Sequence, residues 1–525
     1  MSKVSWTSDQ QKVIDLRNRN ILVSAAAGSG KTAVLVERII TMITDETHPV
    51  DIDHLLIVTF TNAAASEMRD RISKAVEEKL KEDPDSVNLQ KQMALIHSAQ
   101  ITTIHSFCLY VIRNYFNTID LDPSFRIAEE AELKLLQSDV VAQLLEKSYE
   151  ELEENFVELV ECYATGKSDD SLESLILQLY HFSVSYPWPL EWLEEMRKAF
   201  QVTTLEELEE ARWMEQLKEY IAFMLEDLCA EIEDAVSICL EPDGPYMYEA
   251  NLQEEKKMLS DIANVDTYEG LMEAFERVEF KRLPGKKDAS VDADKKEMVK
   301  KKRDRIKKVL SDMKENYFFQ PVEEMLADIH GAKPSIDALI DLTIQFTKEY
   351  AQLKEERGIV DFNDLEHLAL NILVDRDCEQ DTVTPTNVAI ELSEYYEELL
   401  IDEYQDSNLV QETILSNISK EKMGRPNVFM VGDVKQSIYK FRMARPELFM
   451  EKYHTYSTED SLKQRIDLHK NFRSRDVVLS PVNYIFKKIM IPKLGKIKYD
   501  DNAALHVGAN YPNVSGSSTS TELVL

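Results

Sequence analysis

A glycine-rich segment near the N-terminus carries the residue types needed to hold a phosphate group. It reads AAAGSGKT and joins a short apolar run to a segment with helical apolar spacing. Glycines let backbone N–H groups point inward around a phosphate, and the start of a helix adds positive potential. We expect the lysine to reach the β- and γ-phosphates of a nucleotide and the threonine to bind Mg²⁺. The predicted nucleotide contacts are Ala25, Ala26, Ala27, Gly28, Ser29, Gly30, Lys31 and Thr32.

Two acidic residues follow another apolar run much later in the chain, where residues 399–406 read LLIDEYQD. An acidic residue at the end of a buried strand can hold Mg²⁺, and a neighbouring glutamate can deprotonate an attacking water. We assign Asp402 to the metal ion and Glu403 to the general base. The opposing interpretation is a solvated acidic turn, which the phosphate loop elsewhere in the chain makes less favourable.

A further group of polar and aromatic residues follows the apolar segment 427–432. Gln436 comes shortly after this segment, where its side chain could touch a γ-phosphate. Tyr439, Phe441 and Arg442 then place aromatic and cationic groups together, which suits stacking on the bases of a single strand. Core packing is the more common explanation for such a cluster taken alone.

Two segments, 58–72 and 101–116, each read as a strand that turns into a helix. They bring polar or aromatic groups to strand ends, where open α/β sheets bind ligands. His105, taken alone, would usually be a structural histidine. Arg473 precedes an amphipathic helical pattern, and from a second domain it could act on a γ-phosphate as an arginine finger.

The elements that must position these residues predict an α/β fold. Short apolar runs that end at the polar residues are typical of buried parallel strands. The carboxyl ends of such strands meet at one edge of the sheet, so the polar residues are expected to gather there. The predicted strands are 21–24, 55–60, 398–402 and 427–432.

The composition sets the limits of these interpretations. A chain of 525 residues is expected to form two to four domains. The formal charge of −35 gives no hint of nucleic acid, so any contact with DNA must be local. Five scattered cysteines without a CxxC pair suit a cytoplasmic protein, and no apolar run reaches the roughly 20 residues of a membrane span.

The strongest basic run, 295–310, could contact duplex phosphates or be a solvated helix beside acidic neighbours.

Taken together and in this order, the segments resemble the motifs of UvrD-like superfamily 1 DNA helicases, and most closely those of AddA-type helicase–nuclease subunits. WTSDQQKVI is similar to the Q motif of that family. The other matching segments are AAAGSGKT, VTFTNAAASEMRDRI, TTIHSF, LLIDEYQDSN, VGDVKQSIYKFR and LHKNFRS. DPSFRIAEEAE and ERGIVDFNDLEHLAL resemble the AddA type, and the likeness extends to about Tyr511.

The resemblance implies a role for each matched position. Gln10 would read adenine and Phe472 would stack on its ring, while Gln436 and Arg473 would sense the γ-phosphate. The single strand would pass over Phe60, His105, Tyr439, Phe441 and Arg442. The implied activity is ATP- and Mg²⁺-dependent 3′-to-5′ helicase movement on DNA, in a heterodimer with a B-type helicase–nuclease subunit that acts in double-strand-break repair and recombination.

The resemblance also implies a RecA-like architecture with a large all-helical insertion. The expected parts are motor domain 1A from 1–118 and 361–465, helical insertion domain 1B at 119–360, and the beginning of a second, incomplete RecA-like domain 2A with a disordered tail at 466–525. Ala63 stands where many relatives have lysine, and Phe441 stands where they often have tryptophan.

No later helicase motif and no nuclease-type carboxylate cluster follows Arg473. We therefore expect the chain to be the N-terminal part of a longer protein, which by itself binds ATP weakly and unwinds little. Two alternatives stay open: a non-catalytic DNA-binding or assembly module, and a DNA translocase ATPase that does not unwind.

Overall fold

The structure is a computed structural model that describes residues 5–164, 166, 168–286, 288–378, 380–491 and 498–511. The tail 512–525, expected to be disordered, lies outside the described residues. The chain divides into two compact units. Unit 1 comprises Met1–Ala142, Leu177–Pro189 and Phe346–Leu525, and unit 2 comprises Gln143–Ile176 and Leu190–Gln345.

Unit 1 is built on a parallel sheet of six strands in the order β10-β1-β9-β8-β2-β3. Strands β1, β9, β8 and β2 are largely apolar, as expected where both faces of a parallel sheet are covered, whereas the edge strand β10 alternates between polar and apolar residues. The four strands predicted from apolar runs are present close to their expected bounds, which confirms the α/β interpretation. The strands are β1 (Asn20–Ala25), β2 (Leu55–Thr59), β3 (Ile101–Thr103), β8 (Glu398–Ile401), β9 (Val428–Gly432) and β10 (Lys463–Leu468).

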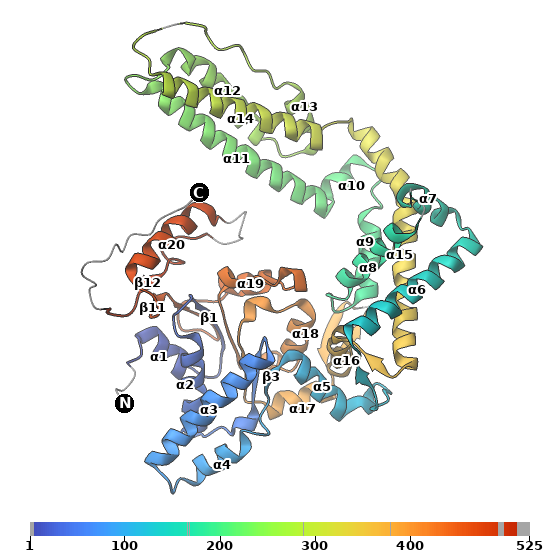
Figure 1. The fold of residues 1–525 in the computed structure, drawn as a ribbon, viewed down its shortest axis with the longest axis vertical. Coiled ribbons are helices and arrows are strands. Elements are labelled where there is room, and N and C mark those ends of the chain that lie inside the picture. The colour runs from blue at the N-terminus through green and yellow to red at the C-terminus, as the bar shows by residue number, and fades with distance from the viewer. Residues whose placement is uncertain are drawn as a thin grey trace. The chain divides into compact units, whose positions relative to one another are not determined.

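Helices cover both faces of this sheet (Figure 1). Along β1, Ile21 and Val23 join the core formed with α1 (Ser8–Asp15), α2 (Lys31–Ile43), α3 (Asn62–Glu82) and α4 (Val87–Leu95). Leu22 points the other way, since side chains alternate along a strand. It joins the core formed with α5 (Ile104–Tyr115), α16 (Phe362–Leu373), α17 (Asn387–Tyr395), α18 (Leu409–Asn417) and α19 (Pro446–Thr455).

The boundaries of unit 1 differ from those expected for the motor domain. The short strands β4 (Arg126–Ile127) and β5 (Ile359–Val360) pair in parallel, which ties together the two ends of the segment expected as an insertion. Residues 119–142 and 346–360 therefore fall in unit 1, as does the segment 177–189. The hairpin of β6 (Val374–Asp377) and β7 (Thr382–Pro385) also belongs to this unit.

Strand β10 is an edge strand of the six-stranded sheet, and β11 and β12, which follow it in the chain, form a separate two-stranded sheet. The expected boundary between residues 465 and 466 falls inside β10, which pairs with β1 along its whole length. Beyond it lie β11 (Lys470–Asn471), α20 (Asp476–Ile489) and β12 (His506–Val507), with β11 and β12 in parallel. No helix in the described part of the chain is both long enough and apolar enough to cross a bilayer.

Unit 2 contains only helices and loops among its described residues. α11 packs against α12 and α14 over an apolar core. Its helices are α7 (Glu154–Tyr163), α9 (Pro189–Ala199), α10 (Leu205–Glu210), α11 (Arg212–Leu240), α12 (Glu249–Ala263), α13 (Tyr268–Glu276) and α14 (Ala293–Tyr317). α6 (Glu130–Glu151), α8 (Asp170–Ser183) and α15 (Val322–Glu356) each have residues in both units.

The basic run 295–310 lies on α14, and several of its cations pair with acidic side chains of unit 2. Lys302 pairs with Asp234 of α11 at 2.7 Å, and Arg305 pairs with Glu231 of the same helix at 2.8 Å. Arg303 is buried and contacts Glu255 through two guanidinium nitrogens. These contacts favour the interpretation of a helix beside acidic neighbours over one that contacts duplex phosphates.

Candidate functional site

The loop between β1 and α2 has the backbone geometry of a phosphate cradle. Gly28 and Gly30 have φ angles of +71° and +88°, a conformation that side chains disfavour. Gly30 is the N-cap of α2 and provides no side-chain cap, so the first N–H groups of the helix keep their capacity to donate. The hydroxyl of Ser29 is buried without a hydrogen-bond partner among the described residues. These features fit an anion held by this loop.

Lys31 begins α2 and pairs with the carboxylate that follows β8. Its Nζ atom lies 3.0 Å from Oε2 and 3.3 Å from Oε1 of Glu403. The neighbouring Asp402 accepts a hydrogen bond from the backbone N–H of Glu403 at 3.0 Å. Thr32, Asp402, Glu403 and Gln436 line one cavity of about 320 Å³. The structure thus brings together residues that the sequence predicted separately for phosphate, metal and general-base roles.

Two aspartates of this region carry strongly shifted pKa values. Burial, and then the charge of Glu403, raise the pKa of Asp402 to about 6. Burial and Glu403 likewise raise the pKa of Asp406 to about 6. A clustered set of carboxylates with raised pKa values gains stability when a cation arrives. In the described ranges, no group of three or more His, Cys, Asp or Glu side chains is arranged to hold a metal ion by itself.

The loop that carries these carboxylates is fixed to the neighbouring strand end. Glu403 has a φ angle of +52°, uncommon for a residue with a side chain, and it precedes the short helix η4 (Tyr404–Asp406). Gln405 donates to Glu403 Oε2 at 2.9 Å and accepts from the N–H of Asp433, beyond β9, at 3.0 Å. Asp433 in turn accepts from Gln436 Nε2 at 2.7 Å. Gln436 is therefore linked to the general-base candidate through a short network.

A second cavity, of about 360 Å³, lies on the other side of the phosphate loop. Gln10 and Phe472, the residues expected to bind adenine, both line it together with Ser29. Gln10 donates to the carbonyl of Ser29 at 3.0 Å and accepts from the N–H of Thr7 at 2.9 Å, which completes a capping box at the start of α1. Its amide is therefore oriented before any base arrives.

The segment that contains Phe472 and Arg473 rests on the phosphate loop. Asn471 donates to the carbonyl of Ala27 at 2.7 Å, and the N–H of Phe472 donates to the carbonyl of Gly28 at 2.8 Å. A Cβ atom at Gly28 would come within 2.7 Å of the Asn471 amide, so a side chain there is excluded. Arg473 is exposed and lines none of the cavities described here, unlike Gln436.

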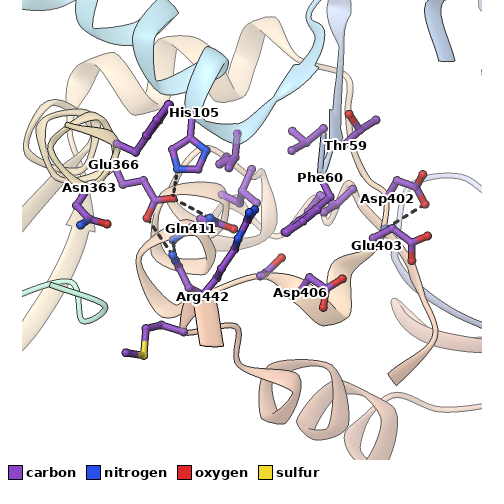
Figure 2. Close-up of a pocket in the computed structure, with 18 of the residues that line it drawn as sticks. Thr59, Phe60, His105, Asn363, Glu366, Asp402, Glu403, Asp406, Gln411 and Arg442 are labelled. Atoms are coloured by element: carbon purple, nitrogen blue, oxygen red, sulfur yellow. Dashed lines mark hydrogen bonds and ion pairs between the residues drawn. The ribbon is translucent and has the colours of Figure 1, made fainter. Parts of the chain in front are cut away.

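A third cavity, of about 580 Å³ and called the aromatic cavity below, is lined by four of the five residues expected to contact a single strand, namely Phe60, His105, Phe441 and Arg442 (Figure 2). The fifth, Tyr439, lines the neighbouring cavity beside Thr32. The rings of Phe60 and Tyr439 lie 4.4 Å apart, and those of Tyr439 and Phe441 lie 5.8 Å apart. Arg442 lies over both Tyr439 and Phe441, and Phe441 is 74% exposed. Such exposure fits a binding surface better than core packing.

His105 lines the same cavity, and its partners were not predicted from the sequence. Its Nε2 atom lies 3.2 Å from Oε1 of Glu366, and its ring meets that of Phe362 edge to face at 5.3 Å. Both partners lie on α16, in the segment ERGIVDFNDLEHLAL. Two signals could have indicated these partners. They are an exposed aromatic residue at the start of the helix and a glutamate on the buried face of the same helix. Ala63, in contrast, is simply exposed in the first turn of α3.

Comparison with known proteins decides the family. The model of the UvrD/REP helicase N-terminal domain matches residues 6–457. The chain belongs to this family. Its members are helicases that use ATP with a metal ion, which agrees with the phosphate loop and the neighbouring carboxylates.

Curated relatives in this family share the sequence over nearly all of the chain. All three described here are named as the A-type subunit of an ATP-dependent helicase/nuclease. The relative from Lachnoclostridium phytofermentans is 54% identical over 542 residues, which cover 100% of this chain and 39% of the relative. Those from Clostridium beijerinckii and Acetivibrio thermocellus are 46% and 45% identical, and each match covers 97% of this chain and 41% of the relative. The chain thus spans about two fifths of the length of these relatives.

Proposed function

We propose that the chain is the nucleotide-binding part of an ATP-driven motor that moves 3′ to 5′ along one DNA strand. The observation that supports this most directly is the wall shared by two cavities. Phe60, Asp402, Glu403 and Asp406 line both the cavity beside Thr32 and the aromatic cavity. A movement of these carboxylates during ATP hydrolysis therefore also changes the wall of the cavity where bases would stack.

The residues beside the phosphate loop fit a triphosphate with Mg²⁺. The N–H groups of 28–30 and the Lys31 ammonium hold the β- and γ-phosphates, while Thr32 and Asp402 bind the metal ion, directly or through water. When bound, Mg²⁺ neutralises charge that develops on the phosphate oxygens and takes its other ligands from phosphate and water.

The remaining residues of this cavity act on water and on the far end of the nucleotide. Glu403 orients the attacking water and accepts its proton, and Gln405 keeps that carboxylate in place. Gln436 senses the γ-phosphate. Arg473 contacts the same phosphate as an arginine finger when the second domain closes over the nucleotide. Gln10 and Phe472 bind the adenine on the other side of the loop.

The aromatic cavity holds the DNA strand. Phe60 and Phe441 line this cavity and stack on bases, together with Tyr439, whose ring contacts both of theirs. Arg442 adds a cation beside them. His105 also lines this cavity and contacts the strand there.

The whole protein, in this proposal, is the helicase–nuclease subunit of a cytoplasmic complex that repairs double-strand breaks with a B-type partner. Unit 2 corresponds to insertion domain 1B, and the segment beyond β10 begins a second RecA-like domain. The exposed apolar side chains of α20 support this assignment, because exposed apolar surface of this kind is typical of a protein–protein interface. They include Val478, Tyr484, Ile485 and Ile489.

Steady-state ATP hydrolysis with and without the oligonucleotide (dT)₁₆ tests the proposal. We expect Mg-ATP binding by the chain to be lost in Lys31→Ala, and DNA to stimulate hydrolysis in a form extended to the length of the relatives. Absence of ATP hydrolysis by the extended form, with and without DNA, would favour the non-catalytic module. Failure of that form to displace the strand of a 3′-tailed duplex, with stimulation intact, would favour the translocase that does not unwind.

A further inference from the structure

Glu366 is a buried carboxylate that the proposed reaction does not use. It lies in the first half of α16, a helix that Asp361 starts with a capping box, and only 4% of its surface is exposed. Burial of an ionised carboxylate costs several kcal/mol unless charged or hydrogen-bonding groups compensate. At this position three side chains do so, and they come from two other parts of the chain.

Figure 2 shows Glu366 at the aromatic cavity with two of its partners, His105 and Gln411, and the third partner is Asn408. His105 Nε2, in the first turn of α5, lies 3.2 Å from Oε1. Asn408 Nδ2 donates to Oε2 at 3.0 Å, and Gln411 Nε2 donates to Oε1 at 2.7 Å. Burial alone would raise the pKa of Glu366, but the hydrogen bonds from His105, Asn408 and Gln411 outweigh it and hold the pKa below its usual value.

Asn408 connects this carboxylate to the loop that bears the catalytic candidates. Its Oδ1 atom caps α18 by accepting from the N–H of Gln411 at 2.8 Å, which leaves its Nδ2 atom for Glu366. The loop from Asp402 to Asn408 is therefore held at both ends. Lys31 holds Glu403 at one end, and Glu366 holds Asn408 at the other.

We propose that Glu366 is a positioning residue that holds the His105 imidazole at the DNA strand and anchors Asn408 at the end of the carboxylate loop. This inference rests on the proposed function, because His105 must contact DNA for its orientation to matter. In this proposal Glu366 acts through His105 and Asn408 and not by its own contact with the strand, because only 4% of its surface is exposed.

The test measures binding of fluorescein-labelled (dT)₁₆ to the 525-residue chain by fluorescence anisotropy. We expect Glu366→Gln to weaken binding about fivefold to tenfold, because the amide cannot accept from all three donors and the imidazole loses its orientation. We expect His105→Ala to weaken it by a similar factor. The double variant should bind (dT)₁₆ about as tightly as whichever single variant binds less tightly. The two losses of affinity should not add, because both changes disrupt the same contact.

Two controls separate positioning from general loss of structure. Glu394→Gln removes the same charge from an exposed position of α17 that lines no described cavity, and it should bind (dT)₁₆ like the unmodified chain. The imidazole ¹H–¹⁵N resonances of His105 should shift in Glu366→Gln and stay unchanged in Glu394→Gln. A mere decrease in stability would not move the resonances of one histidine in the folded protein.

Different outcomes overturn different claims. If the unmodified chain fails to bind (dT)₁₆, both the proposed function and this inference are wrong. If the unmodified chain binds but Glu366→Gln binds equally well, or if its effect adds to that of His105→Ala, only the inference about Glu366 is wrong.

Discussion

The ammonium of Lys31 and the carboxylate of Glu403 form an ion pair at 3.0 Å, although 372 residues separate them in the chain. Lys31 is 13% exposed and Glu403 36% exposed, so the pair is only partly screened by water. Both residues have to act on the same nucleotide in the proposed reaction. Lys31 must therefore exchange Glu403 for phosphate oxygens, which frees Glu403 to accept a proton from water.

The ion pair predicts opposite effects of two substitutions on nucleotide binding. Glu403→Gln releases Lys31 and should leave Mg-ATP affinity unchanged or a few fold tighter, while hydrolysis falls by about 10²–10⁴. Lys31→Ala should lose the affinity itself. Equilibrium titration with a fluorescent ATP analogue, followed by single-turnover hydrolysis, measures both quantities. Weaker nucleotide binding by Glu403→Gln would contradict the exchange.

The carboxylate of Asp402 is expected to lower the stability of unit 1 and to be required for metal binding. Its pKa rises from 3.8 to about 6 on folding, so its contribution to stability is full below pH 3.8 and is lost as the pH rises through about 6. Asp402→Asn removes this cost and should stabilise unit 1 at pH 8 by about 2–3 kcal/mol, with a gain that shrinks toward pH 4. Calorimetric unfolding at both pH values measures the gain. The variant should also lose Mg²⁺-dependent nucleotide binding, and a variant destabilised at pH 8 would show that burial does not strain this carboxylate.

The fixed amide of Gln10 predicts that the site binds ATP more tightly than GTP. Because its amide is already held between Thr7 and Ser29 beside the cavity that Phe472 lines, Gln10→Ala should weaken ATP binding about tenfold and GTP binding much less. The neighbouring Gln11 is exposed on the same helix, so Gln11→Ala is a matched control that should change neither affinity. Equal losses for ATP and GTP would mean that Gln10 only supports the loop.

The buried pair of Arg38 and Glu398 predicts a large effect on stability. The two side chains are 0% and 5% exposed, and Arg38 also donates to the carbonyl of Val13. Arg38→Met should destabilise unit 1 by about 3–5 kcal/mol, because it leaves the carboxylate of Glu398 buried without a cation. Arg71→Met breaks an exposed pair with Glu67 and should cost less than about 1 kcal/mol. Similar shifts of the unfolding midpoint for the two variants would contradict this reasoning.

The ion pairs of Lys302 and Arg305 on α14 predict that these two cations do not bind duplex phosphates. Substituting Lys302 and Arg305 together by glutamine should leave the affinity for a 3′-tailed duplex and its salt dependence nearly unchanged. Loss of two phosphate contacts would instead lower the slope of log K against log salt by about two. Anisotropy titrations at several salt concentrations distinguish these results.

The sequence predicted those parts of the site that depend on local pattern. The phosphate loop and the carboxylates after β8 could be located because short apolar runs end in polar residues, and buried parallel strands bring such ends to one edge. Tyr439 and Phe441 were grouped from the local pattern, and Phe60 joined them through the family resemblance; the contacts among the three rings agree with that grouping.

Contacts between distant segments could not be predicted in this way. The alternation of polar and apolar residues in Lys463–Leu468 is typical of a half-buried strand, but nothing local indicates that this strand lies beside β1. The return of 177–189 to unit 1 depends on contacts such as His367 Nε2 with the carbonyl of Val184 at 2.9 Å. The role of Glu366 was missed for the same reason, because its three partners lie in two other parts of the chain.

A structure of the chain with Mg²⁺ and a non-hydrolysable ATP analogue tests the central claim most directly. We predict the γ-phosphate within hydrogen-bond distance of Lys31 Nζ and Mg²⁺ about 2.0–2.1 Å from Thr32 Oγ1, with Asp402 on the metal ion directly or through one water. The distance from Lys31 to Glu403 should then exceed that of an ion pair. A nucleotide bound elsewhere, with the ion pair intact, would contradict the account.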